Sequence, residues 1–177
     1  MKYIYFILLS TLIVSCGVKV PFTDDLKKEY DLNNAEVMKQ VQFFTSNTII
    51  LERVVTKGTK AKTDEGTLVT NKSKEQNRII IPVNTKCIFD SYDANGSINV
   101  RFELGLNKTI KFGIRDNQVT GRYYFVADWS YDKGGEIKYG DETYYANANS
   151  GNSFLMVAIK KLQKTRRRDR VVKGLKV

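Results

Sequence analysis

The chemistry open to this chain is limited first by the residue types that it lacks. Its 177 residues include no histidine, and cysteine occurs only at Cys16 and Cys87. Serine and cysteine triads use an imidazole base, and most zinc sites use histidine or several cysteines. Lysine-assisted serine chemistry and paired-carboxylate chemistry remain open, but the sequence carries no motif for either. We therefore expect no catalytic residue, no cofactor and no metal.

Three carboxylates, Asp90, Glu103 and Asp128, would serve glycan hydrolysis only if the fold brought two of them together. Residues 91–96 have the spacing of a calcium loop, but Ser91 and Phe102 stand where its first and last acidic ligands belong. We interpret 91–96 as a hairpin turn, because Asn-Gly at 95–96 strongly favours one. Scattered strand carboxylates are mostly surface groups, so a hydrolase is the least favoured function.

The first cysteine follows an apolar leader. After Met1-Lys2, an apolar run of thirteen residues extends to Ser15. As a helix it would span about 20 Å, short of the roughly 30 Å hydrocarbon layer, so we expect a signal peptide rather than a membrane span. Ile13-Val14-Ser15-Cys16 resembles the lipobox of bacterial lipoproteins. The alternatives are an uncleaved helix, or a cut elsewhere with Cys16 incidental.

The lipobox resemblance implies a lipid anchor. It implies removal of the signal peptide 1–15, a diacylglyceryl thioether on Cys16, and acylation of the new amine, with palmitate a typical acyl group. Two or more acyl chains hold a protein firmly at a membrane. Residues 16–22 then form a short lipidated tether. Because no aspartate follows Cys16, the same resemblance implies an outer-membrane location facing the periplasm.

The remaining cysteine and the charge distribution give two further expectations. Cys87 lies in a strand-like run and should be a small buried hydrophobic residue. Residues 160–176 hold nine basic residues and one acidic residue, a net charge of +8 out of +10 for the chain. The candidate binding cations in this run are Lys160, Lys161, Lys164, Arg166, Arg167, Arg168, Arg170 and Lys173.

Closely spaced arginines suit phosphate groups. The basic run could therefore bind anionic lipid, an acidic partner protein or an anionic cell-wall polymer. Alternatively, it is a solvated hairpin between strands at 154–161 and 170–177 whose charges oppose edge-to-edge association. In the expected compartment, nucleic acid is not an expected partner.

The elements that must position these residues begin with a helical segment over 23–46. Asn33 followed by Glu36 predicts a capped helix, and Val37, Val41 and Phe44 form one apolar stripe at helical spacing. A weaker helix or turn is expected over 23–30. Both are most simply structural elements that cover the open end of a sheet.

From residue 47 onward the pattern predicts about ten short strands. Expected ranges are 48–56, 67–71, 78–83, 87–92, 97–104, 109–114, 122–129, 136–139, 143–146, 154–161 and 170–177. The turn at 63–66 joins lysine-rich flanks, which predicts an exposed polar hairpin, and Pro82 favours an edge or a bend. Regularly spaced short strands with glycine in their turns predict a mainly β domain, a small barrel or sandwich, over 47–177.

The span that begins with Ile80 to Lys86 and continues through Ser97 to Phe102 resembles the strand pattern of SH3-like barrels. The resemblance covers about a quarter of the body. It implies a module that docks with proteins or binds cell-wall peptide, as such barrels do in bacterial envelopes.

Aromatic residues cluster at Tyr123-Tyr124, Trp129 and Tyr144-Tyr145. Successive strand side chains point to opposite faces, so one tyrosine of each pair should lie outside. Exposed members could stack on sugars, whereas the plainer interpretation is core packing.

Together these observations favour a non-catalytic lipoprotein that is an accessory or structural component of an envelope complex for secretion, assembly or cell-wall attachment. Its expected partners are the membrane, through the anchor, and an envelope protein complex. A peptidoglycan- or glycan-binding module is the alternative.

Overall fold

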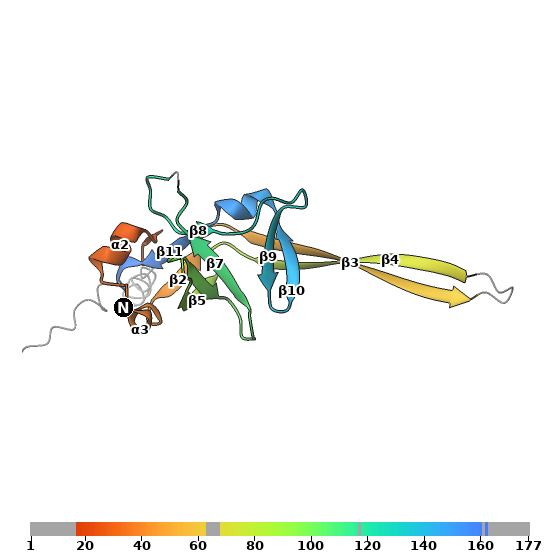
Figure 1. Ribbon diagram of the computed structural model, residues 1–177. Helices are drawn as coiled ribbons and strands as arrows, with labels where there is room; N and C mark the ends of the chain where they lie inside the picture. The colour runs from red at the N-terminus through yellow and green to blue at the C-terminus, as the bar shows by residue number, and fades with distance from the viewer. Residues whose placement is uncertain (1–16, 63–67, 117, 161, 163–177) are drawn as a thin grey trace, which may run out of the picture.

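The structure is a computed structural model that describes residues 17–62, 68–116, 118–160 and 162, and only the backbone along 56–62 and 68–74. Two antiparallel sheets make up most of it, with two short helices near the N-terminus (Figure 1). The predicted mainly β fold with an N-terminal helical segment is therefore confirmed. Across the described ranges the strands form two separate sheets and no closed barrel.

The larger sheet has seven strands. In spatial order they are β1 (Lys19–Pro21), β11 (Leu155–Ala158), β2 (Gln42–Thr45), β5 (Lys86–Tyr92), β6 (Ile98–Arg101), β7 (Thr109–Gly113) and β8 (Tyr124–Phe125). The smaller sheet has the order β4 (Leu68–Ile81), β3 (Ile49–Lys62), β10 (Glu142–Ala146) and β9 (Gly135–Tyr139). Every pair is antiparallel, as expected for strands joined by short turns.

The core lies on one face of the larger sheet. Alternate strand residues such as Phe43, Cys87 and Val100 are buried, and their neighbours along each strand point to the other face. Phe22 packs edge-on against Phe43, with ring centroids 5.1 Å apart, and against Tyr123 at 5.2 Å. Cys87 is thus the small buried residue that we predicted, and burial raises the pKa of its thiol.

The N-terminal helices differ in detail from the prediction. α2 (Asp24–Glu29) is capped by Thr23, whose hydroxyl accepts a hydrogen bond from the amide of Leu26, so the weaker predicted helix is confirmed. α3 (Ala35–Met38) is capped by Asn34 rather than Asn33 and has only four residues.

The predicted helical stripe through Val41 and Phe44 is wrong, because Phe44 lies in β2. Phe43 and Phe44 are consecutive and both buried, which a strand achieves on its two faces. Pairing of β2 with β5 and β11 on both sides outweighs the helical spacing.

Both ends of the chain join the larger sheet more closely than expected. Residues 19–21, within the expected tether, form β1 and pair with β11. The strand expected over 154–161 ends at Ala158, after which the chain is helical at Ile159 and Lys160, and Leu162 is buried in the core. The strand expected over 170–177 lies outside the described residues.

The chain passes between the two sheets four times, and buried hydrogen bonds join two of these crossings. The short 3-10 helix η2 (Ala148–Asn152) links β10 to β11, and residues 46–48 link β2 to β3. Ser150 Oγ accepts a hydrogen bond from the amide of Ile50 at 2.9 Å, and Ser153 Oγ donates to the carbonyl of Asn47 at 3.2 Å. Both serines are fully buried, so these bonds fix the relative position of the sheets.

The turn before β9 provides a stability test. Gly134 has φ of 110°, and a Cβ there would lie 2.4 Å from the carbonyl oxygen of Ala146. We expect Gly134→Ala to lower the free energy of unfolding by about 3 kcal/mol, since it combines backbone strain with a clash against backbone. The measurement is urea unfolding followed by circular dichroism.

Gly96→Ala is the matched control. Gly96 also has a positive φ, 77°, but nothing lies within 4 Å of the added Cβ. This variant should lose only about 1 kcal/mol. Equal losses in the two variants would contradict the close approach of Gly134 to Ala146.

Candidate functional site

A two-stranded arm is the most prominent feature outside the body of the molecule. β3 and β4 pair continuously from Ile49↔Ile81 to Lys62↔Leu68. The two strands predicted over 67–71 and 78–83 are therefore one strand of 14 residues. Figure 1 shows β3 and β4 extending away from the rest of the molecule as a ribbon. The expected turn at 63–66 lies outside the described residues.

The base of the arm is anchored in the core. Ile49, Leu51 and Ile81 are buried, and β10 pairs with β3 only at Leu51 and Glu52. Ion pairs join Arg53 to Glu142 at 2.6 Å and Arg78 to Glu52 at 3.0 Å. The body therefore supports the arm as far as about residue 53.

Beyond its base, the arm leaves the body. Residues 53–62 of β3 would extend about 34 Å at the antiparallel rise per residue. Within the described ranges no third strand pairs with this part of the ribbon, so both of its edges present unpaired backbone groups. Val54 is 61% exposed on the surface of the ribbon. Open strand edges of this kind are templates for pairing with another chain.

The predicted basic run lies almost entirely outside the described residues. Lys160 is described and is exposed, two residues after β11 ends. The other seven cations, Lys161, Lys164, Arg166, Arg167, Arg168, Arg170 and Lys173, lie outside the described part of the chain. Their binding role stays a prediction.

The predicted stacking tyrosines divide between the core and the surface. Tyr123 is buried, which raises the pKa of its hydroxyl to about 12, so it is not available for stacking. Tyr124 is half-buried and packs edge-on against Phe154, with Arg115 lying 4.6 Å from its ring centroid. Of this pair, only Tyr124 faces outward.

Tyr144 and Tyr145 point to opposite faces of the smaller sheet, as alternation predicts. Tyr144 packs against Tyr139 with centroids 6.5 Å apart. Tyr145 packs against the exposed Tyr131 at 6.4 Å, and a hydrogen bond with Glu136 raises the pKa of the Tyr145 hydroxyl. Tyr145 therefore lies at the surface in a fixed position rather than as an open platform.

Trp129 borders an open cleft of about 320 Å³, lined also by Arg115, Ala148, Gly151 and Asn152. Its side chain is 43% exposed. Gly135 and Gly151 allow its close approach, because a Cβ at either would lie 2.9 Å or less from a neighbouring side-chain atom. No sequence pattern pointed to Arg115, which lies on a loop and donates a hydrogen bond to the carbonyl of Gly151.

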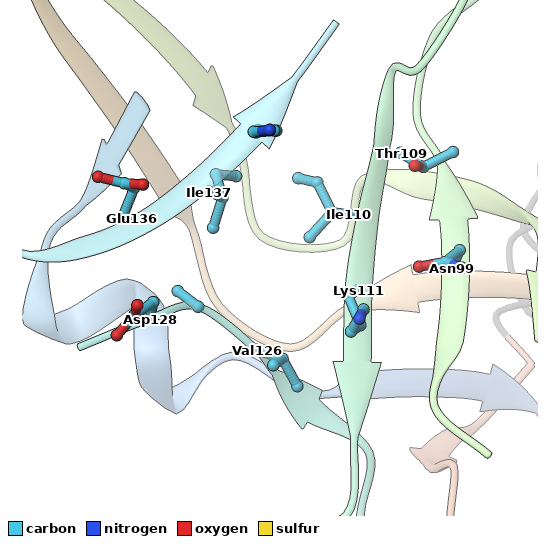
Figure 2. Close-up of a pocket in the computed structure, with 10 residues that line it drawn as sticks. Asn99, Thr109, Ile110, Lys111, Val126, Asp128, Glu136 and Ile137 are labelled. Carbon is cyan, nitrogen blue, oxygen red and sulfur yellow. The ribbon is translucent and has the colours of Figure 1, made fainter. Parts of the chain in front are cut away.

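A second cleft of about 340 Å³ lies between the two sheets (Figure 2). Ile110 of β7 and Ile137 of β9 face the space from opposite sides, and Asp128 and Glu136 lie together at one end. Lys111, also at this cleft, forms an ion pair of 2.5 Å with Asp93 and lowers the pKa of that carboxyl. The cleft therefore combines an apolar floor with polar groups at its rim.

The three carboxylates considered for hydrolysis each have their own partner. Asp90 forms an ion pair with Arg101, and Glu103 forms one with Lys108 at 2.7 Å. Asp128 accepts a hydrogen bond from the amide of Ser130 at 3.0 Å. The Lys108 hydrogen bond lowers the pKa of Glu103, and the hydrogen bonds from Ser130 lower the pKa of Asp128. A general acid needs a raised pKa, so neither of these two carboxylates is tuned for that role.

Within the described ranges, no group of three or more histidine, cysteine, aspartate or glutamate residues could hold a metal ion. Nor does any described helix have the length and apolar character needed to span a membrane.

Comparison of the chain with protein-family models, curated proteins and solved structures finds no significant match.

Proposed function

We propose that this protein is a non-catalytic, lipid-anchored component of a bacterial envelope assembly, and that the β3–β4 arm is its docking element. The observation that supports this proposal is the length of ribbon that extends beyond the body with both edges open. A role in secretion, assembly or cell-wall attachment fits such an element. The proposed location is the periplasmic face of an outer membrane.

The energetics of the arm favour a partner. A two-stranded ribbon is at best marginally stable in water, because it has no third strand and no second layer. Fixing each residue of the backbone costs about 1–2 kcal/mol, which ladder hydrogen bonds offset only in part. A strand of a partner added to either edge would complete the backbone hydrogen bonds and cover exposed groups such as Val54.

The proposed anchor lies close to the folded body. β1 begins at Lys19, three residues after Cys16. Three residues reach at most about 11 Å, so a lipid on Cys16 would hold the edge of the larger sheet near the bilayer surface. The arm would then be the part of the chain best able to reach partners away from that edge.

We also propose that the basic run after β11 contacts an anionic partner or anionic lipid. Lys160, the described member of the run, is exposed. Its arginines, Arg166, Arg167, Arg168 and Arg170, supply planar donors suited to phosphate and carboxylate groups.

Shortening the arm tests the docking proposal. Residues 56–74 are replaced by Asn-Gly, which joins the register partners Val55 and Glu75 through a two-residue hairpin turn. Crosslinking in intact cells followed by mass spectrometry should show loss of the main crosslinked partners. The urea midpoint of the purified protein should change little, because the buried residues of the arm, Ile49, Leu51 and Ile81, all lie outside the replaced segment.

The matched control keeps both strands of the arm and replaces only residues 63–67 with glycine and serine. This control should retain the crosslinks, because the strand edges are intact. Unchanged crosslinks in the shortened variant would overturn the assignment of the arm as the docking element.

The anchor is tested by intact-mass measurement of the protein purified from membranes. We expect the leader to be absent and Cys16 to carry a diacylglyceryl group and a third acyl chain. Cys16→Ser should remove this mass and move the protein to the soluble fraction or leave the leader uncleaved. Cys87→Ser is the control and should leave the lipid mass unchanged. An unmodified Cys16 thiol in the native protein would contradict the anchor.

One observation favours a second candidate function, the binding of peptidoglycan or another glycan. The half-exposed Trp129 beside Arg115 and Asn152 combines an aromatic surface with polar groups in an open cleft. We expect Trp129→Ala to weaken retention of the protein on insoluble cell wall by roughly 5- to 10-fold, the loss of about one stacking contact.

Tyr131→Ala is the control for this glycan test, since Tyr131 is also exposed but does not line the Trp129 cleft. Retention that persists in high salt would favour stacking, and retention lost in salt would favour the cations. Equal retention of the Trp129 variant and the unaltered protein, with unchanged urea midpoints, would exclude this cleft as the glycan site.

A further inference from the structure

The loop between β6 and β7, residues 102–108, holds two leucines outward. Leu104 is 90% exposed and Leu106 is 86% exposed. Leu104 also borders a shallow groove of about 210 Å³ with Phe102 and the half-exposed Ile88. A single exposed leucine is ordinary on a protein surface, but here two lie in one loop and Leu104 continues into the groove. We call residues 102–108 the leucine loop.

Hydrogen bonds brace the leucine loop against the body. The Arg101 guanidinium donates to the carbonyl of Gly105 at 2.6 Å and to Asp90. The amide of Gly140 in the β9–β10 turn donates to the carbonyl of Asn107 at 2.9 Å. Within the loop, Lys108 pairs with Glu103 at 2.7 Å.

The backbone of the leucine loop is built for this conformation. Gly105 has φ of 136° and Asn107 has φ of 56°, values in the left-handed region that glycine and asparagine tolerate best. The conformation therefore displays the leucines without help from any contact of their own. Fixing a loop in one conformation costs conformational entropy, and leucines that stay exposed to water bury no apolar surface to offset that cost. The fixed conformation therefore indicates that the loop is preorganised for an apolar environment.

We propose that the leucine loop inserts Leu104 and Leu106 into the boundary between headgroups and acyl chains of the bilayer. The inserted groups are aliphatic, whereas the dominant residues of protein–protein interfaces are tryptophan, tyrosine and arginine. The carbonyls of Gly105 and Asn107 already have donors, which lowers the cost of moving this backbone out of water. Lys86, exposed at the same groove, suits anionic headgroups.

The proposal rests on the lipid anchor, which would supply most of the affinity of the protein for the membrane. Two leucines alone give weak, reversible attachment, but a chain already held at the membrane needs only enough affinity to choose an orientation. In Figure 1 the loop that leads into β7 lies at the lower side of the body, while the arm points to the right. Insertion of the loop would therefore orient the arm along the membrane surface.

Labelling at position 106 tests the insertion. In the native lipidated protein the Cys16 sulfur is blocked and Cys87 is buried, so Leu106→Cys supplies one reactive thiol for the environment-sensitive dye NBD. The labelled protein is reconstituted into vesicles of phosphatidylethanolamine and phosphatidylglycerol. Compared with the same labelled protein in detergent-free solution without vesicles, we expect a blue-shifted NBD emission and an intensity gain of about twofold or more. Brominated acyl chains should quench this emission.

Val119→Cys is the matched control. Val119 is fully exposed on another loop, so its label should stay in water and escape the brominated lipid. Leu104→Asp in the Leu106→Cys protein should reduce the quenching, because a carboxylate opposes insertion. Both altered leucines are at least 86% exposed, so these changes should leave the fold intact, which the urea midpoint checks.

The outcomes separate the insertion from the anchor. A label at position 106 that stays in water, in protein whose intact mass shows lipid on Cys16, would overturn the insertion and leave the anchor standing. A label shielded only after soluble envelope proteins are added would overturn it in favour of a protein partner. Quenching by brominated vesicles in protein without lipid on Cys16 would support the insertion while the anchor fails.

Discussion

The buried hydrogen bonds of Ser150 and Ser153 hold the two sheets of this protein together. Ser150 Oγ accepts the amide of Ile50 and donates to Asn147 Oδ1 at 2.7 Å, while Ser153 Oγ donates to the carbonyl of Asn47. A buried polar group that loses its partner costs about 1–3 kcal/mol, so these contacts specify one arrangement of the crossings at residues 46–48 and 147–154. Because β3 begins at Ile49, directly after the first crossing, this junction also sets the direction of the arm.

The junction separates a packed body from the surfaces that face outward. The aromatic core around Phe22, Phe43 and Tyr123 stabilises the larger sheet and carries no exposed chemistry. The arm, the Trp129 cleft and the leucine loop all lie on the periphery, and each is held by backbone or ionic contacts to the body. A rigid body with several outward contact surfaces is suited to an assembly component, whose task is to hold partners in fixed relative positions.

Local patterns predicted a large part of this arrangement. Asn95-Gly96 identified the β5–β6 hairpin, and apolar alternation identified β5, β6 and β7 to within one to three residues. Cys87 was predicted as a buried residue from its strand-like surroundings. Helical spacing misassigned Phe44. The spacing of residues 37, 41 and 44 fits one helix, but it fits equally well a short helix that ends at Met38 and a strand that begins at Gln42. Local sequence cannot distinguish these two without knowing the partner strands.

The sequence by itself determined the mainly β class, the N-terminal helical segment, the absence of imidazole chemistry and the uneven placement of charge, since each depends only on residue type or short-range spacing. Tertiary structure alone decided that the strands around 67–71 and 78–83 are one, that Tyr123 is buried while Trp129 borders a cleft, and that Arg101 braces a loop displaying two leucines. Those features depend on contacts such as Arg115 with Gly151 and Gly140 with Asn107. The partners in these pairs are more than thirty residues apart, and no local pattern records which distant segments meet.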